Sequence, residues 1–153
     1  MPALENKIPP PLVMILFGLM MWIAALITPS FDVSQLTRIG LSVSILFLGV
    51  FFCLSGVVSF KIAKTTVNPL NPELASALVS SGIYRVSRNP MYLGFACLLV
   101  AWAVYLASPV ALLGVFAFVV FINRYQIAPE ERALTHLFGA EFTEYTASVR
   151  PWL

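Results

Sequence analysis

The stretch SGIYRVSRNPMYLG, residues 81–94, is the most polar part of a very apolar chain, and the rest of the sequence is organised around it. It carries two cations and two tyrosines: Tyr84, Arg85, Arg88 and Tyr92. Asn89 is a good helix N-cap, and Pro90 suits a first helical turn because its missing N–H needs no partner there. We therefore interpret the stretch as a loop that brings cations and tyrosines to the mouth of a membrane helix. The alternative is a basic juxtamembrane loop that only fixes topology.

The composition indicates an integral membrane protein. Of the 153 residues, 59% are hydrophobic and only 10% are charged, and the mean hydropathy is +0.90. A soluble domain carries roughly 25% charged residues. We predict a single membrane-embedded domain, residues 1–153, of the all-α class. The net charge of +2 is too small to indicate a nucleic-acid partner, and no spacing of cysteine and histidine indicates a metal site.

Three long uncharged runs define the membrane spans: residues 8–31, 39–60 and 89–123. About 20 apolar residues cross a bilayer, so each of the first two runs fits one span. We expect the first to be a retained span, because no small-residue cleavage site follows it. The third would be about 50 Å long as one helix, which is too long for one crossing, and Ala107-Ser108-Pro109 offers a break. We therefore predict four transmembrane helices, with the last two forming a tight hairpin: 10–28, 39–60, 91–107 and 109–124.

Small residues and polar segments complete the sequence-based prediction. The glycines that recur in 39–60, at 40, 49 and 56, indicate close helix packing. Residues 61–90 form a polar loop, with a short surface helix at 74–79. A helix at 129–148 begins at Pro129 and carries apolar residues at helical spacing, which suits a helix lying on the membrane surface.

The cations predict the orientation. Most of them fall before the first span, between the second and third, or after the fourth: Lys7, Lys61, Lys64, Arg85, Arg88, Arg124, Arg132 and Arg150. Only Arg38 falls on the other side. Because cytoplasmic segments carry the excess of Lys and Arg, we predict that both termini and the loop 61–90 face the cytoplasm.

Two polar blocks meet on this cytoplasmic face if the hairpin forms. Arg88-Asn89 and Asn123-Arg124 then become neighbours, and Glu130 and Glu131 follow closely. Carboxylates, guanidiniums and tyrosines at a membrane surface suit a zwitterionic small molecule. The alternatives are plain: acids in a first turn complement the helix dipole, and Arg124 can simply snorkel from the end of a span.

At these residues the sequence resembles a known family. RNPMYLG (88–94), a span hairpin and then PEERALTHLFGAEFTEYTASVRPWL (129–153) look like the isoprenylcysteine carboxyl methyltransferase-like and phospholipid methyltransferase superfamily. The resemblance covers about residues 65–153. It implies a small membrane enzyme that uses S-adenosylmethionine, releases S-adenosylhomocysteine and acts on a lipophilic or lipidated substrate among membrane lipids.

The resemblance also implies a set of cofactor-binding residues: Tyr84, Arg85, Arg88, Asn89, Pro90, Tyr92, Leu93, Gly94, Glu130 and Glu131. The chemistry fits, because glutamates can bind the ammonium, ribose hydroxyls or adenine amine of the cofactor. An arginine can clamp the carboxylate through two prongs, and tyrosine faces suit adenine or the sulfonium.

The sequence does not decide which chemical group accepts the methyl group. Arg124 and Asn89 are the catalytic candidates, with Arg124 orienting an anionic acceptor. Asn89 stands where the isoprenylcysteine enzymes usually carry histidine, and only histidine could take a proton near neutral pH. The chain also lacks Gly-x-Gly, an element associated with the phospholipid N-methyltransferases. We favour a carboxylate acceptor, with an amine or thiol as the alternative. A non-enzymatic membrane module that binds anionic lipid or a partner protein is the alternative of another class.

Overall fold

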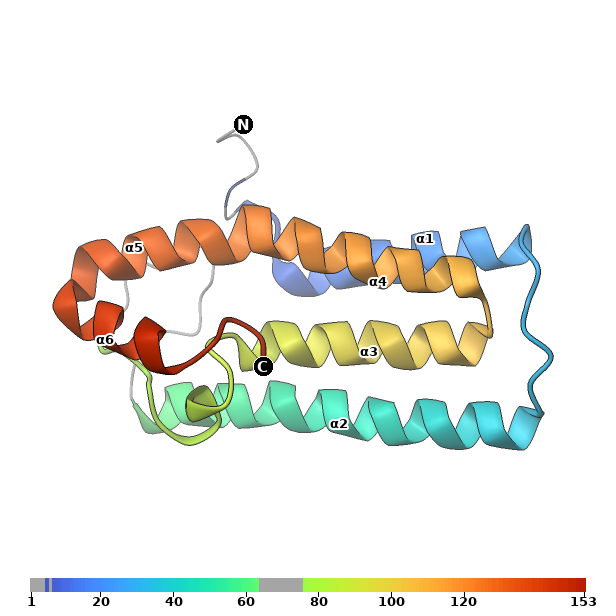
Figure 1. Cartoon of the computed structure of the whole chain (residues 1–153), viewed down its shortest axis with the longest axis horizontal. Coiled ribbons are helices and arrows are strands. Elements are labelled where there is room, and N and C mark those ends of the chain that lie inside the picture. The colour runs from blue at the N-terminus through green and yellow to red at the C-terminus, as the bar shows by residue number, and fades with distance from the viewer. Residues whose placement is uncertain (1–4, 6, 64–75) are drawn as a thin grey trace.

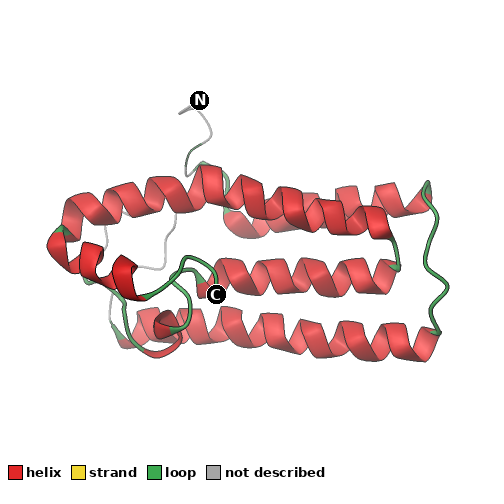
Figure 2. Cartoon of the chain, in the orientation of Figure 1, coloured by secondary structure: helices red, strands yellow, loops and turns green. Residues whose placement is uncertain are grey.

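The computed structural model describes residues 5, 7–63 and 76–153, and all the regular elements in these residues are helices (Figure 2). This confirms the all-α class for the described part of the chain. The elements follow in chain order: α1 (Pro10–Leu26), α2 (Gln35–Ile62), the 3-10 helix η3 (Gly82–Arg85), α3 (Pro90–Leu106), α4 (Pro109–Ile122), the π-helical segment η4 (Asn123–Ile127), α5 (Ala128–Phe138) and α6 (Ala140–Ser148).

Helix α3 lies at the centre of the bundle and contacts α1, α2 and α4 (Figure 1). Glycines allow α2 and α3 to approach closely. A Cβ atom on Gly94 would lie 2.4 Å from the Cys53 sulfur and 2.7 Å from the Gly49 carbonyl oxygen. One on Gly56 would lie 2.6 Å from the side chain of Met91, whereas Gly40 has nothing within 4 Å. The packing role predicted for the α2 glycines is therefore confirmed at Gly49 and Gly56 and is wrong at Gly40.

The outer surface of the bundle is apolar. Large side chains are widely exposed on three helices, with Phe47 on α2 at 67%, Leu113 on α4 at 66% and Ile15 on α1 at 59%. Gln35–Ile62 and Pro109–Phe138 are long and apolar enough to cross a membrane, and α1 and α3 are shorter apolar helices. Exposed apolar surface of this extent indicates a lipid environment rather than water.

The two ends of the bundle differ in polarity. At one end, the α1–α2 connection meets the turn between α3 and α4. The Phe31 N–H donates to the Ala107 carbonyl oxygen at 2.7 Å, and the hydroxyls of Thr28 and Ser108 lie 3.3 Å apart. At the other end lie η3, η4, α5 and α6 (Figure 1). Arg38 belongs to the first end, and the other described cations belong to the second.

Helix boundaries differ from the predicted ones where side-chain capping decides them. Helix α2 begins at Gln35, four residues before the predicted span, because the Ser34 hydroxyl accepts from the Thr37 N–H at 3.2 Å. Residues 76–79 are not helical, and residues 74 and 75 of the predicted surface helix lie outside the described residues, as does Lys64. The loop prediction for 61–90 missed η3 and the last two residues of α2.

The predicted helix 129–148 is wrong in two ways. It does not begin at Pro129, because α4 continues through η4 into α5. The Ala128 N–H bonds the Asn123 carbonyl oxygen five residues earlier, and this wider turn accommodates the proline ring and its missing N–H. The helix is also broken at Gly139, whose φ of +52° ends α5 before α6 begins.

Candidate functional site

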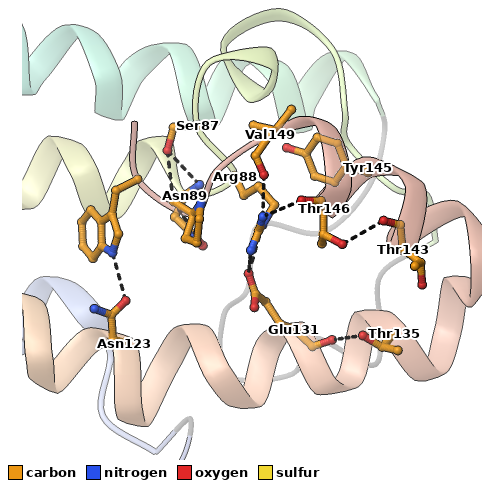
Figure 3. A network of polar contacts seen from close by, with 12 residues as sticks. Ser87, Arg88, Asn89, Asn123, Glu131, Thr135, Thr143, Tyr145, Thr146 and Val149 are labelled. Atoms are coloured by element: carbon orange, nitrogen blue, oxygen red, sulfur yellow. Dashed lines mark hydrogen bonds and ion pairs between the residues drawn. The ribbon is translucent and has the colours of Figure 1, made fainter.

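The two sequence motifs meet through an ion pair between Arg88 and Glu131 (Figure 3). Arg88 precedes α3 and Glu131 lies in the first turn of α5. The Arg88 Nε and Nη2 atoms lie 3.0 Å and 2.6 Å from Glu131 Oε1, and the side chains are 11% and 32% exposed. Both contacts use one carboxylate oxygen, so Glu131 Oε2 has no protein partner among the described residues.

The remaining donors of Arg88 are also engaged. Its Nη1 atom donates to the carbonyl oxygens of Thr146, at 3.3 Å, and Val149. Its backbone N–H donates to the Arg150 carbonyl oxygen at 3.0 Å. The guanidinium predicted to clamp the cofactor carboxylate thus already binds a protein carboxylate and two backbone carbonyls.

Asn89 occupies the N-cap position of α3, but its side chain does not cap the helix, so that part of the prediction is wrong. Its Nδ2 atom instead donates to the Pro151 carbonyl oxygen at 2.9 Å. Ser87 supports the same contact, because its hydroxyl donates to the Pro151 carbonyl oxygen at 3.3 Å and accepts from the Asn89 N–H at 3.1 Å. The Asn89 side chain therefore binds the 149–152 segment instead of capping its own helix.

Asn123 lies across the same segment from Asn89. The Trp152 indole N–H donates to Asn123 Oδ1 at 2.9 Å (Figure 3). The predicted neighbours Asn89 and Asn123 are therefore connected through Pro151 and Trp152. Arg124 is exposed and forms no ion pair with any described residue.

Tyr92 and Glu130 form a second contact between α3 and α5. The buried Tyr92 hydroxyl donates to Glu130 Oε1 at 2.5 Å, at the short end of the range for O–H···O hydrogen bonds. Glu130 lies beyond the predicted span 109–124, and burial raises the pKa of its carboxyl to about 8. The Tyr92 hydrogen bond lowers this pKa and the neighbouring Glu131 raises it. Glu130 can therefore take or release a proton near neutral pH.

Tyr84 is buried in a small apolar cluster beside this contact. Its ring meets Phe60 edge-to-face at 5.5 Å, and its backbone carbonyl accepts from the Tyr145 hydroxyl at 2.7 Å. Burial raises the pKa of the Tyr84 hydroxyl, and Tyr145 and Glu130 raise it further. Tyr84 is therefore a neutral aromatic wall rather than an acid or base.

The other predicted residues fall into two groups. Three lie in the first turns of α3 and are buried: Pro90, Leu93 and Gly94. Of these, Gly94 faces α2, and its closest neighbours are Cys53 and Gly49 of that helix. Arg85 is exposed and lines a surface groove with Glu141 and Glu144, and neither Arg88 nor Glu131 lines this groove.

The sequence analysis missed Gln126 and Trp152. Gln126 is fully buried in η4, and its Nε2 atom donates to the Ile8 carbonyl oxygen at 2.9 Å. Its Oε1 atom is buried and has no partner among the described residues. A glutamine next to an apolar run was a signal that could have been used. Trp152 offered no signal, because its contact depends on the tertiary fold.

Comparison with known proteins gives the family. Residues 37–141 match the phospholipid methyltransferase family. An uncharacterised protein of Haemophilus influenzae is 44% identical over 63 residues, which cover 41% of this chain and all of that protein. Protein-S-isoprenylcysteine O-methyltransferase A of Arabidopsis thaliana is 37% identical over 83 residues, which cover 52% of this chain and 41% of that protein.

The Saccharomyces cerevisiae protein-S-isoprenylcysteine O-methyltransferase is 37% identical over 80 residues, which cover 50% of this chain and 32% of that protein. The chain thus spans well under half the length of the named methyltransferases that it matches. No solved structure matches it. On the family match, which covers most of its length, the chain belongs to the phospholipid methyltransferase family, in one superfamily with the isoprenylcysteine methyltransferases.

Proposed function

We propose that this chain is an integral membrane enzyme that transfers a methyl group from S-adenosylmethionine to a lipophilic or lipidated acceptor. The observation that carries the proposal is the meeting of two motifs at one end of an apolar bundle. Arg88 pairs with Glu131 and Tyr92 binds Glu130, although the partners are about forty residues apart in sequence. The family match and the names of the relatives support the reaction class.

The donor set of this region fits the cofactor. Glu131 Oε2 has no protein partner in the described residues, and it belongs to a carboxylate that Arg88 holds in place. Such an oxygen suits an ammonium group or a ribose hydroxyl, since hydrogen bonds to charged groups are the strong ones. Glu130 adds a second carboxyl group, and the buried side chains of Tyr84 and Tyr92 lie beside it. When bound, the cofactor supplies a methyl group on a positively charged sulfur.

The protein's own contribution is orientation and exclusion of water. A direct displacement needs the acceptor atom in line with the methyl carbon and the leaving sulfur, and it needs no covalent enzyme intermediate. Arg88 acts on this site through Glu131, because its donors are engaged by protein oxygens. Asn89 acts in the same way through Pro151.

The acceptor is a carboxylate in our leading version of the proposal. Arg124 is exposed on η4 at the same end of the bundle and has no ion pair in the described residues, so it is free to orient an anion. The names of two relatives, which specify O-methylation of isoprenylcysteine, favour a carboxylate over an amine or a thiol.

We propose four membrane spans, built from α1, α2, α3 and α4, with α3 and α4 as a hairpin. Helices α1 and α3 have 17 residues each, so they cross only with local thinning or burial against their neighbours. All described cations except Arg38 belong to the end with α5 and α6. This asymmetry favours a cytoplasmic site and cytoplasmic termini.

Methyl transfer from labelled S-adenosylmethionine tests the proposal. The purified protein in detergent is given a farnesylated cysteine with a free carboxylate, the same compound as an amide, or phosphatidylethanolamine. We expect label in the free carboxylate alone. Label in phosphatidylethanolamine would move the acceptor to an amine, and no label with any acceptor, together with binding of anionic vesicles, would favour the non-enzymatic module.

A further inference from the structure

The first three residues of the 149–152 segment are bound by Arg88 and its two sequence neighbours. The carbonyl oxygens of Val149, Arg150 and Pro151 each accept from Ser87, Arg88 or Asn89. Four hydrogen bonds of this kind involve both backbone and side-chain donors. The segment is therefore hydrogen-bonded to the residues that begin α3 and does not extend freely into solvent.

The same segment connects the two apolar cores. Val149 packs against the cluster of Tyr84, Phe142 and Tyr145, and Trp152 packs against the cluster that contains Tyr92. Trp152 is half-buried, and its indole N–H donates to Asn123 at the end of α4. The Trp152–Asn123 hydrogen bond and this packing tie the far end of the segment to the α4–α5 helix.

The position of this segment determines the position of the Glu131 carboxylate. A guanidinium is planar and rigid, so fixing Nη1 on the Thr146 and Val149 carbonyls fixes the directions of Nε and Nη2. Those two atoms hold Glu131 Oε1 and leave Oε2 without a protein partner. A shift of Val149 would therefore turn Arg88 and move the carboxylate.

We propose that Trp152 is a positioning residue of the site: its hydrogen bond to Asn123 holds the 149–152 segment, and the segment sets Arg88 and, through it, Glu131. What Glu131 binds rests on the function proposed above. The coupling from Trp152 to Arg88 does not rest on it, because it is a property of the fold.

Amide hydrogen exchange tests the coupling without a ligand. The Arg88 N–H donates to the Arg150 carbonyl, so its exchange reports opening of the segment. Trp152→Phe keeps the ring and removes only the N–H, and Asn123→Ala removes the acceptor. Each should speed exchange at Arg88 about two- to tenfold, the effect of losing one typical hydrogen bond. Asn123→Asp keeps an acceptor oxygen and should restore slow exchange, and Leu153→Ala, at an exposed residue, is the matched control. Equal exchange in wild type and Trp152→Phe would overturn the coupling.

S-adenosylhomocysteine affinity tests the positioning role. We expect Trp152→Phe and Asn123→Ala to weaken it about two- to tenfold at temperatures where both variants are folded, with recovery in Asn123→Asp. Faster exchange at Arg88 with unchanged affinity would overturn the positioning role. If the wild-type protein binds no S-adenosylhomocysteine, the proposed function fails, and the exchange data still decide the coupling.

Discussion

A single oxygen of Glu131 accepts two hydrogen bonds from Arg88, at 3.0 Å from Nε and 2.6 Å from Nη2. This contact joins the start of α3 to the first turn of α5, two segments 43 residues apart in the sequence. A side-on bond of this kind orients a carboxylate while leaving its second oxygen available. Under the proposed function, Arg88 therefore acts on the site through Glu131.

Replacing Arg88 by lysine tests the need for a planar fork. Lysine keeps the charge but cannot hold Glu131, Thr146 and Val149 in one fixed plane. We expect Arg88→Lys to misplace the Glu131 carboxylate, which should lower S-adenosylhomocysteine affinity about tenfold, the worth of one charge-assisted bond, and to lower the melting temperature. Arg150→Lys, at an exposed side chain, is the control. Unchanged affinity in Arg88→Lys would leave Arg88 with a structural role alone.

The two glutamates should respond differently to glutamine. If Glu131 Oε2 binds the cofactor as proposed, Glu131→Gln loses a charge-assisted bond, which costs about 1.5–3 kcal/mol, or roughly ten- to hundredfold in affinity. In Glu130→Gln the Tyr92 hydroxyl still finds an amide oxygen, so the loss should be smaller. Cofactor affinity and melting temperature are measured together. Lower melting temperatures with intact affinity in both variants would reduce the pair to complements of the helix dipole.

Stability should fall as the pH rises toward 8. The pKa of Glu130 is raised from 4.5 to about 8 in the folded protein, mainly by burial. Between pH 4.5 and about pH 8, Glu130 therefore keeps its proton in the folded state but has lost it in the unfolded state. Its contribution to stability is complete below pH 4.5 and is lost as the pH passes through 8. Melting temperatures of wild type and Glu130→Gln between pH 5 and 9 check this, and equal slopes would contradict it.

The α2–α3 contact should not tolerate a side chain on Gly94. A Cβ atom there would lie 2.4 Å from the Cys53 sulfur and 2.7 Å from a backbone oxygen of α2. We expect Gly94→Ala to destabilise the protein by about 1–3 kcal/mol, as overpacking does. Gly40→Ala, which meets nothing within 4 Å, should be neutral or slightly stabilising. A stable Gly94→Ala with lost cofactor affinity would instead make Gly94 a binding residue.

Labelling of single cysteines tests the topology, after Cys53 and Cys97 are replaced. Ser80 is exposed near η3, and Asp32 is exposed in the α1–α2 connection at the opposite end. Ser108 at that end is unsuitable because it is only 2% exposed. We expect Ser80→Cys to react from the cytoplasmic side and Asp32→Cys from the other. Reaction of both from one side would contradict the four-span proposal.

The helices could be predicted because uncharged runs mark them in the sequence. The meeting of the two motifs could be predicted because it follows from a hairpin of the last two spans. The continuity of α4 and α5 could not, because Pro129 ordinarily starts a helix and only the π-helical turn before it permits passage. Asn89 illustrates the other limit. Its capping preference is local, whereas its observed partner, the Pro151 carbonyl, is 62 residues away. A backbone carbonyl is present at every residue, so the sequence does not show which one a distant side chain will bind.

The most direct measurement is titration calorimetry of S-adenosylhomocysteine against the detergent-solubilised protein, with Glu131→Gln alongside. The account predicts saturable binding to wild type and binding about ten- to hundredfold weaker in the variant, measured at a temperature where both are folded. No heat of binding at millimolar S-adenosylhomocysteine, with a protein that melts cooperatively, would contradict a cofactor site at the Arg88–Glu131 pair.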